Sequence, residues 1–210
     1  GAKGCDFYDE SLGLFLPDKD GIVPITDDEY FADDIVSRTV DFIRKVYGAD
    51  TLDENLRFVA SALGNKGATP QEVLRNYYLK DFYTDHLRTY QKRPIYWQFD
   101  AGKQDSLKCL AYLHRYDQDT VARIRTDYVH ELQDRLRVQL EDAQQTAENG
   151  EGRMRTAAAK RAQKLEKQLM EMSKYEEIVP HYADMRLELD LDDGVKVNYG
   201  KFADLLTKIK

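Results

Sequence analysis

The chain has 210 residues, of which 42% are hydrophobic and 33% are charged. A chain of this length and composition can bury a sizeable core, which excludes bulk disorder. No apolar run approaches the roughly 18 residues of a membrane-spanning helix, and two cysteines, Cys5 and Cys109, are too few for a disulfide framework or a metal site. We therefore expect a globular protein of a reducing compartment, the cytoplasm, with no membrane partner. Because the chain begins Gly1-Ala2-Lys3 without an initiator Met, we also expect a piece of a longer protein.

The formal net charge of −7 is distributed unevenly along the chain. Residues 1–60 hold 6 basic and 14 acidic side chains, whereas residues 61–115 hold 9 basic and 5 acidic ones. The acidic residues 1–60 argue against a polyanionic partner. The basic residues 61–115, however, also form the most aromatic part of the chain. The whole-chain charge is therefore a poor guide to what the protein binds.

Residues 12–90 predict a hairpin followed by a small helical bundle. Apolar residues alternate before and after the polar turn at 17–21, which is typical of two short antiparallel strands. Thr26 and Glu29 have the spacing of a capping box, and Thr69-Pro70 is a typical helix start. We expect helices over 26–48, 51–64 and 69–87.

Residues 94–210 predict a second hairpin and two long helices. Ile95, Trp97 and Phe99 alternate with polar neighbours, and a matching run over 107–114 suggests a hairpin with its odd-numbered face buried. Apolar residues spaced by three and four then predict two long helices joined by a Gly-rich turn. We expect these helices over 119–149 and 153–179, then a short hairpin over 187–197 and a last helix from Phe202.

These patterns together predict a mainly α fold with small β-hairpins, of the α+β class. Its parts are a helical bundle, a β-hairpin and a long antiparallel helical hairpin. We expect the segment boundaries to give residues 1–116 as the bundle with β-hairpins, 117–179 as the helical hairpin, and 180–210 as the returning hairpin and C-terminal helix.

A search for catalytic and cofactor motifs is negative. The sequence contains no GxxxxGK[ST], GxGxxG, HExxH, CxxC or GxSxG. The acidic run over 188–194 lacks the EF-hand spacing, because Asp193 precedes Gly194 and Tyr199 stands where a calcium loop needs Glu. The four histidines share no ligand spacing, so structural roles are favoured over metal binding or acid–base chemistry. We predict no catalytic, cofactor-binding or metal-binding residue in this chain.

The stretch over 77–116 interleaves basic and aromatic residues on the predicted second hairpin. Cations suit phosphates, planar side chains suit bases and a two-stranded ribbon fits a major groove, so the pattern is typical of a nucleic-acid reader. The ordinary alternative is that the aromatic residues form core and the cations a solvated face. The basic residues over 160–167 are interpreted in that ordinary way, as coiled-coil flanks with interspersed glutamates. The candidate DNA-binding residues are Lys92, Arg93, Lys103, Lys108 and Arg115, extended by Arg123 and Arg125.

Several stretches, taken in order along nearly the whole chain, resemble one known protein family. They are Asn76-Tyr77-Tyr78-Leu79-Lys80-Asp81-Phe82, the stretch 90–97 with its Lys92-Arg93-Pro94-Ile95-Tyr96-Trp97 string, and the stretches 22–35, 114–116, 120–128, 179–186 and 192–201. They resemble the C-terminal region of the adenine-specific DNA methyltransferases of BREX phage-defence systems, the PglX family. The Lys92–Trp97 string also resembles related single-chain type II restriction–modification methyltransferases.

The resemblance implies a parent enzyme that transfers a methyl group from S-adenosylmethionine to the N6 atom of adenine, a site-specific adenine DNA methyltransferase. The Pro-Pro pair of that family's catalytic motif is missing, because the five prolines stand apart, and no cofactor-binding glycine motif is present. This chain would then supply target recognition in residues 1–116 and a helical clamp on duplex DNA, without a catalytic role of its own. The alternative is a protein-interaction scaffold that docks other phage-defence subunits and makes no direct DNA contact.

Overall fold

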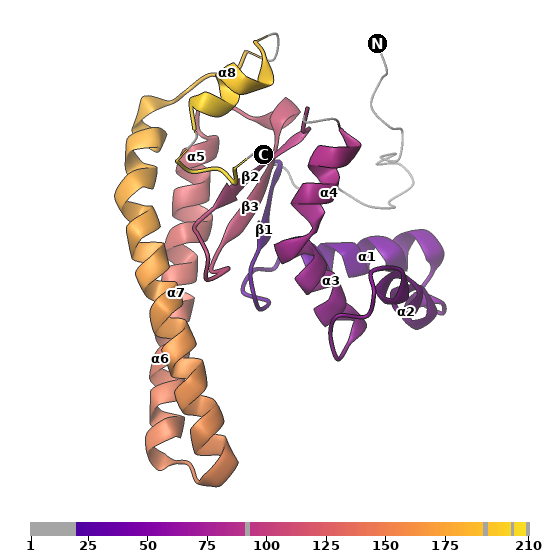
Figure 1. The fold of residues 1–210 in the computed structure, drawn as a ribbon, viewed down its shortest axis with the longest axis vertical. Coiled ribbons are helices and arrows are strands. Elements are labelled where there is room, and N and C mark those ends of the chain that lie inside the picture. Colours follow the sequence, from indigo (N-terminus) through magenta and orange to yellow (C-terminus); the bar gives the residue numbers. More distant parts are fainter. Residues whose placement is uncertain (1–19, 91–92, 191–192, 203, 209–210) are drawn as a thin grey trace.

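The computed structural model describes residues 20–90, 93–190, 193–202 and 204–208. A small antiparallel sheet occupies the centre, with four short helices on one side and two long helices on the other (Figure 1). The long helices extend well beyond the sheet as a projecting antiparallel pair (Figure 1). The predicted mainly α fold with a small β component is confirmed.

The sheet contains strands β1 (Ile22–Ile25), β2 (Tyr96–Asp100) and β3 (Lys108–Tyr112) in the order β1-β3-β2. The predicted second hairpin is present, with Trp97 opposite Ala111. The predicted partner of β1 in an opening hairpin, residues 12–16, lies outside the described residues. Within them β1 instead pairs with β3, Ile22 opposite Ala111, so the sheet joins segments that are far apart in the sequence.

The last described residues extend the sheet at the free edge of β2. The N–H of Asp100 donates to the carbonyl of Leu205 at 2.9 Å, and the N–H of Thr207 donates to the carbonyl of Gln98 at 2.8 Å. Leu206 forms an antiparallel bridge with Phe99. The prediction of a helix from Phe202 is therefore wrong, because this segment pairs with the outer edge of β2.

Both faces of the sheet are buried, each under its own hydrophobic cluster. Trp97, Phe99 and Cys109 belong to a cluster shared with the long helices and Phe202. Ile25 and Leu110 belong to a second cluster shared with the short helices. The predicted burial of the odd-numbered face is confirmed, and the short helices cover the even-numbered face as well.

The short helices are α1 (Ile35–Tyr47), α2 (Leu52–Ala62), α3 (Pro70–Lys80) and α4 (Phe82–Thr89). The predicted start of the first helix at Thr26 is wrong, because Asp34 is its N-cap and accepts from the N–H groups of Val36 and Ser37. The predicted cap at Thr69 is present and accepts from the Glu72 N–H at 3.2 Å. The single helix expected over 69–87 is two, divided at Asp81.

The projecting pair is formed by a continuous helical run and a second helix that folds back along it. The run comprises α5 (Thr120–Arg123), a π-helical segment η3 (Ile124–His130) and α6 (Glu131–Asn149). The returning helix, α7 (Gly152–Met185), was expected to end before Pro180. It continues because Val179 and Ala183 are both buried against the core, which holds the backbone helical on either side of the proline.

The segment after α7 differs from the prediction. The strand pair expected over 187–197 is replaced by a helix, α8 (Val195–Gly200), while the residues before it within 187–190 have no regular structure. Leu191 and Asp192 lie outside the described residues. Phe202, which follows α8, is fully buried with its ring centroid 5.5 Å from that of Trp97. The first cluster thus contains residues from all three predicted segments.

Candidate nucleic-acid interface

The seven predicted DNA-binding residues fall into three groups in the structure. Lys92 lies outside the described residues. Lys108, Arg123 and Arg125 have their charged groups engaged within the chain. Arg93, Lys103 and Arg115 form the third group, whose side chains are exposed at the surface, and Arg115 also has an interaction within the chain.

Lys108 is an interior residue and does not present its charge to solvent. Only 9% of its side chain is exposed, and its Nζ donates to the carbonyl of Leu79 at 2.7 Å and to Asp105 at 3.0 Å. Asp105 also accepts from Lys80. Although burial opposes ionisation, the hydrogen bonds from Lys80 and Lys108 hold the pKa of Asp105 below its ordinary value. Lys108 therefore joins β3 to the end of α3, and we leave it out of the proposed DNA contacts.

Arg123 and Arg125, in the first turns of the long helical run, form ion pairs within the chain. Arg123 donates to Asp117 at 2.7 Å. Although slight burial opposes ionisation, this contact holds the pKa of Asp117 below its ordinary value. Arg125 pairs with Glu176 on α7 at 2.7 Å, and His130 contacts the same Glu176 oxygen at 3.1 Å. Both arginines are thus used to position helices against the body of the protein.

Arg93, Lys103 and Arg115 do not form one compact patch. Arg93 precedes β2 and Arg115 follows β3, and a hydrogen bond from the Leu113 N–H to the Ile95 carbonyl at 3.0 Å brings these two segments together. Lys103 stands in the turn at the opposite end of the same hairpin. The hairpin therefore presents basic residues at both of its ends, about 16 Å apart for five residues of strand.

The turn that carries Lys103 is docked on α7 by Glu171, a residue that no sequence motif indicates. The Glu171 carboxylate accepts from the N–H of Gln104 at 2.8 Å and from the N–H of Ser106 at 3.3 Å, and also from the Ser106 hydroxyl. Gly102 lies so close that a Cβ there would overlap the carboxylate. A glycine and a serine in one short polar turn were the only sequence signal for this contact.

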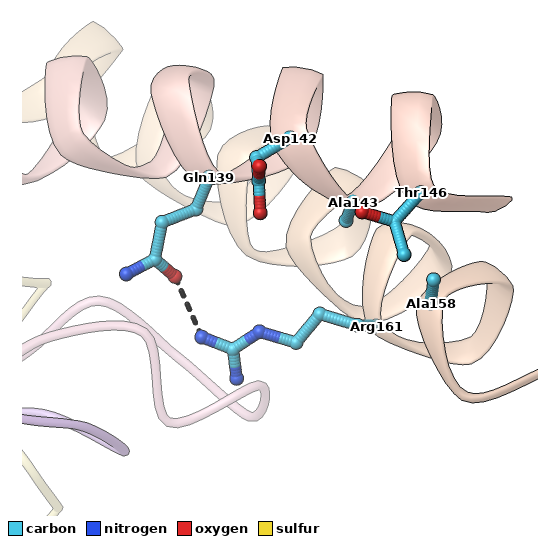
Figure 2. Close-up of a pocket in the computed structure, with 6 residues that line it drawn as sticks. All are labelled: Gln139, Asp142, Ala143, Thr146, Ala158 and Arg161. Atoms are coloured by element: carbon cyan, nitrogen blue, oxygen red, sulfur yellow. Dashed lines mark hydrogen bonds between the residues drawn. The ribbon is translucent and has the colours of Figure 1, made fainter. Parts of the chain in front are cut away.

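A pocket in the described part of the chain is lined by residues that form no catalytic arrangement. A depression of about 330 Å³ lies between α6 and α7, where Arg161 donates to Gln139 at 2.6 Å (Figure 2). Arg161 also approaches the Tyr30 hydroxyl at 3.3 Å, and burial is the main reason that the pKa of Tyr30 is raised to about 12. Across the part of the chain that the structure describes, no three His, Cys, Asp or Glu side chains are placed to hold a metal ion.

His86 and Cys109 are structural residues of the interior. The His86 ring packs against Tyr83 and Tyr90, and its Nε2 accepts from the Ile95 N–H at 3.2 Å. Burial lowers the pKa of His86 and raises the pKa of the Cys109 thiol. Cys5 lies outside the described residues. Among the described helices, none is long and apolar enough to cross a membrane.

Comparison with known proteins confirms the resemblance seen in the sequence. The chain is 43% identical over 202 residues, 93% of its length, to the adenine-specific methyltransferase BrxX of Escherichia coli O9:H4 (strain HS). It is also 43% identical over 210 residues to the adenine-specific methyltransferase PglX of Lacticaseibacillus casei (strain Zhang). The chain spans 17% of the length of each of these relatives. No protein-family model matches it.

Proposed function

We propose that this chain is the DNA-holding part of an adenine-specific DNA methyltransferase and not a catalyst by itself. The observation that carries the proposal is the 43% identity, over nearly the whole chain, to two adenine-specific methyltransferases of which it spans 17%. Methyl transfer from S-adenosylmethionine would take place elsewhere in such an enzyme, since this sequence contains neither the Pro-Pro catalytic motif nor a cofactor-binding glycine motif.

A base methyltransferase needs a part with this role for a physical reason. The N6 atom of adenine is reached by turning the base out of the stack, which costs a few kcal/mol and requires the flanking duplex to be held. Phosphate contacts supply most of that grip and fix the register, while groove contacts read the sequence. Arg93 and Arg115 at one end of the β2–β3 hairpin, with Lys103 at the other, are the described side chains of the predicted set that can make such contacts.

Binding of the 210-residue chain to a labelled duplex tests the proposal. We expect the fluorescence anisotropy of a duplex of about 30 base pairs, roughly three helical turns, to rise on addition of protein. We expect the affinity to fall at least tenfold between about 50 mM and about 200 mM salt, because phosphate contacts release counterions. No binding at the lowest salt would overturn the proposal.

The protein-interaction scaffold is the competing function, and exposed aromatic residues on the short helices favour it. Tyr47 is 61% exposed and Phe58 is 73% exposed, and such side chains are enriched at protein interfaces. A triple variant, Arg93→Gln with Lys103→Gln and Arg115→Gln, separates the two functions. DNA binding should weaken severalfold more than in a control that replaces Arg44, Arg57 and Lys66 by Gln, whereas a scaffold role predicts equal behaviour of the two variants.

A further inference from the structure

Four basic residues form a straight row along α7. Arg153, Lys160, Lys167 and Lys174 are spaced by seven residues, which is nearly two helical turns, so each lies almost directly along the helix axis from the previous one. All four are exposed. At 1.5 Å per residue the row is about 31 Å long, with a cation every 10 Å or so.

The four row residues differ from the basic residues beside them in having no ion-pair partner among the described residues. Arg161 and Lys164, which face the body of the protein, pair with Asp28 and Asp27. Within the described ranges, no ion pair or hydrogen bond involves the charged group of any of the four row residues. The expectation that basic residues here are neutralised by interspersed glutamates does not hold for this face.

Two glutamates of α7, Glu166 and Glu171, have their carboxylates directed away from the row. Glu166 approaches Gln144 on α6 at 3.5 Å, on the side where the two long helices meet. Glu171 lies between Lys167 and Lys174 by helical spacing, but its carboxylate is occupied by the N–H groups of the β2–β3 turn. The Glu171 carboxylate is therefore used by a contact inside the protein, and the exposed Glu177, three residues after Lys174, is an acid beside the end of the row.

That same contact brings Lys103 to the row. The turn is held on Glu171 through Gln104, the residue after Lys103, and Glu171 is four residues after Lys167 and three before Lys174. Residues at these spacings share one face of a helix. The row and the hairpin turn thus form one basic surface, which we define as Lys103 with the four α7 residues.

We infer that the α7 row is a second contact surface for the phosphate backbone of duplex DNA, an inference that rests on the proposed function. A run of evenly spaced cations about 31 Å long matches a regular polyanion, since one turn of B-DNA is about 34 Å. Lysine and arginine that neutralise phosphates bind without reading sequence. The helical hairpin then acts as a rail along the duplex, and the β2–β3 hairpin is held beside it through Glu171.

The test replaces all four row residues, as Arg153→Gln, Lys160→Gln, Lys167→Gln and Lys174→Gln in the 210-residue chain. The probe is the labelled duplex described above. Because each phosphate contact contributes about 0.9 to the slope of log affinity against log salt, we expect the loss of four contacts to reduce the slope by about 3.6 and the affinity at about 50 mM salt at least tenfold. A matched control replaces Arg44, Arg57, Lys66 and Arg137 by Gln, which removes the same charge from other surfaces.

The outcomes separate this inference from the proposed function. If the unmodified chain fails to bind the duplex at all, the proposed function fails, and the inference with it. If the unmodified chain binds and the row variant retains the affinity and salt slope of the control, only the inference is overturned. If the row variant unfolds at a lower temperature than the control, two double variants replace it, Arg153→Gln/Lys160→Gln and Lys167→Gln/Lys174→Gln. We expect each double variant to lose about half as much of the salt slope as the fourfold variant, and double variants with an unchanged slope would overturn the inference.

Discussion

Glu171→Ala should release the β2–β3 turn from α7 and destabilise the fold by about 2 kcal/mol. The magnitude follows from what each donor loses. Ser106 is only 1% exposed, so its N–H and O–H would be left in the interior, and a buried unsatisfied donor costs about 1–3 kcal/mol. The Ser106 hydroxyl can still turn to the Gln168 carbonyl at 3.4 Å, and the exposed Gln104 N–H can reach water. One orphaned N–H and one weakened O–H bond therefore account for the loss.

Urea unfolding followed by circular dichroism measures this loss, and Glu166→Ala is the matched control. Glu166 is on the same helix and is exposed, and its one hydrogen bond among the described residues is with Gln144 at 3.5 Å, so its loss should change the free energy of unfolding by less than about 0.5 kcal/mol. A Glu171→Ala effect as small as that of the control would refute the reasoning. A second measurement compares two differences in the free energy of unfolding and so does not depend on the size of the Glu171→Ala effect. Gly102→Ala should cost less in the Glu171→Ala background than in the unmodified chain, because the added Cβ would then no longer meet the carboxylate.

Two further predictions concern buried charges. Arg75→Ala should lower the free energy of unfolding by about 3–5 kcal/mol, since it leaves the fully buried Asp34 carboxylate without the two guanidinium contacts at 2.8 and 2.9 Å. Arg44→Ala, which breaks only the exposed pair with Asp41, should cost about 0.5 kcal/mol or less, and urea titrations with equal losses would contradict this account. The folded protein should also lose stability as the pH falls below about 6.5, because burial lowers the pKa of His86 beneath its unfolded value, so that the unfolded chain binds the proton first. His86→Phe should remove that His86 contribution, seen as a smaller change of melting temperature between pH 7 and pH 5.5 or so, while costing about 1–3 kcal/mol at pH 7 through the orphaned N–H groups.

The sequence was sufficient wherever a local pattern decided the structure. Trp97 and Phe99 alternate with polar residues and do form a strand, and the Thr69-Pro70 pair does begin a helix. The capping box at Thr26 fails for a non-local reason. The true cap, Asp34, is completed by Arg75 from α3, which is 41 residues away in the chain and leaves no trace in local spacing.

The candidate interface was predictable in its residue types but not in its members. Strand alternation placed Lys108 on a solvent face, and only the packing of α3 over that face reveals that its ammonium group is bound to the Leu79 carbonyl. Conversely, the interspersed glutamates make the α7 cations resemble ordinary coiled-coil flanks in the sequence. Their significance depends on Glu171 being taken up by the β2–β3 turn, which is a tertiary contact.

The way the sheet is assembled has a consequence for the integrity of the chain. The backbone from β1 to α6 provides most of the sheet, while α7 and the segment around Leu206 supply one wall of the core and the outer edge of β2. The two portions meet where α7 packs on α5, η3 and α6 and where residues 205–207 pair with β2, and the chain passes from one portion to the other at the tip around Gly150 and Gly152. A break in the backbone at the projecting tip would therefore leave two fragments with complementary surfaces, because one holds the sheet and the other holds a wall of its core and the segment that pairs with β2.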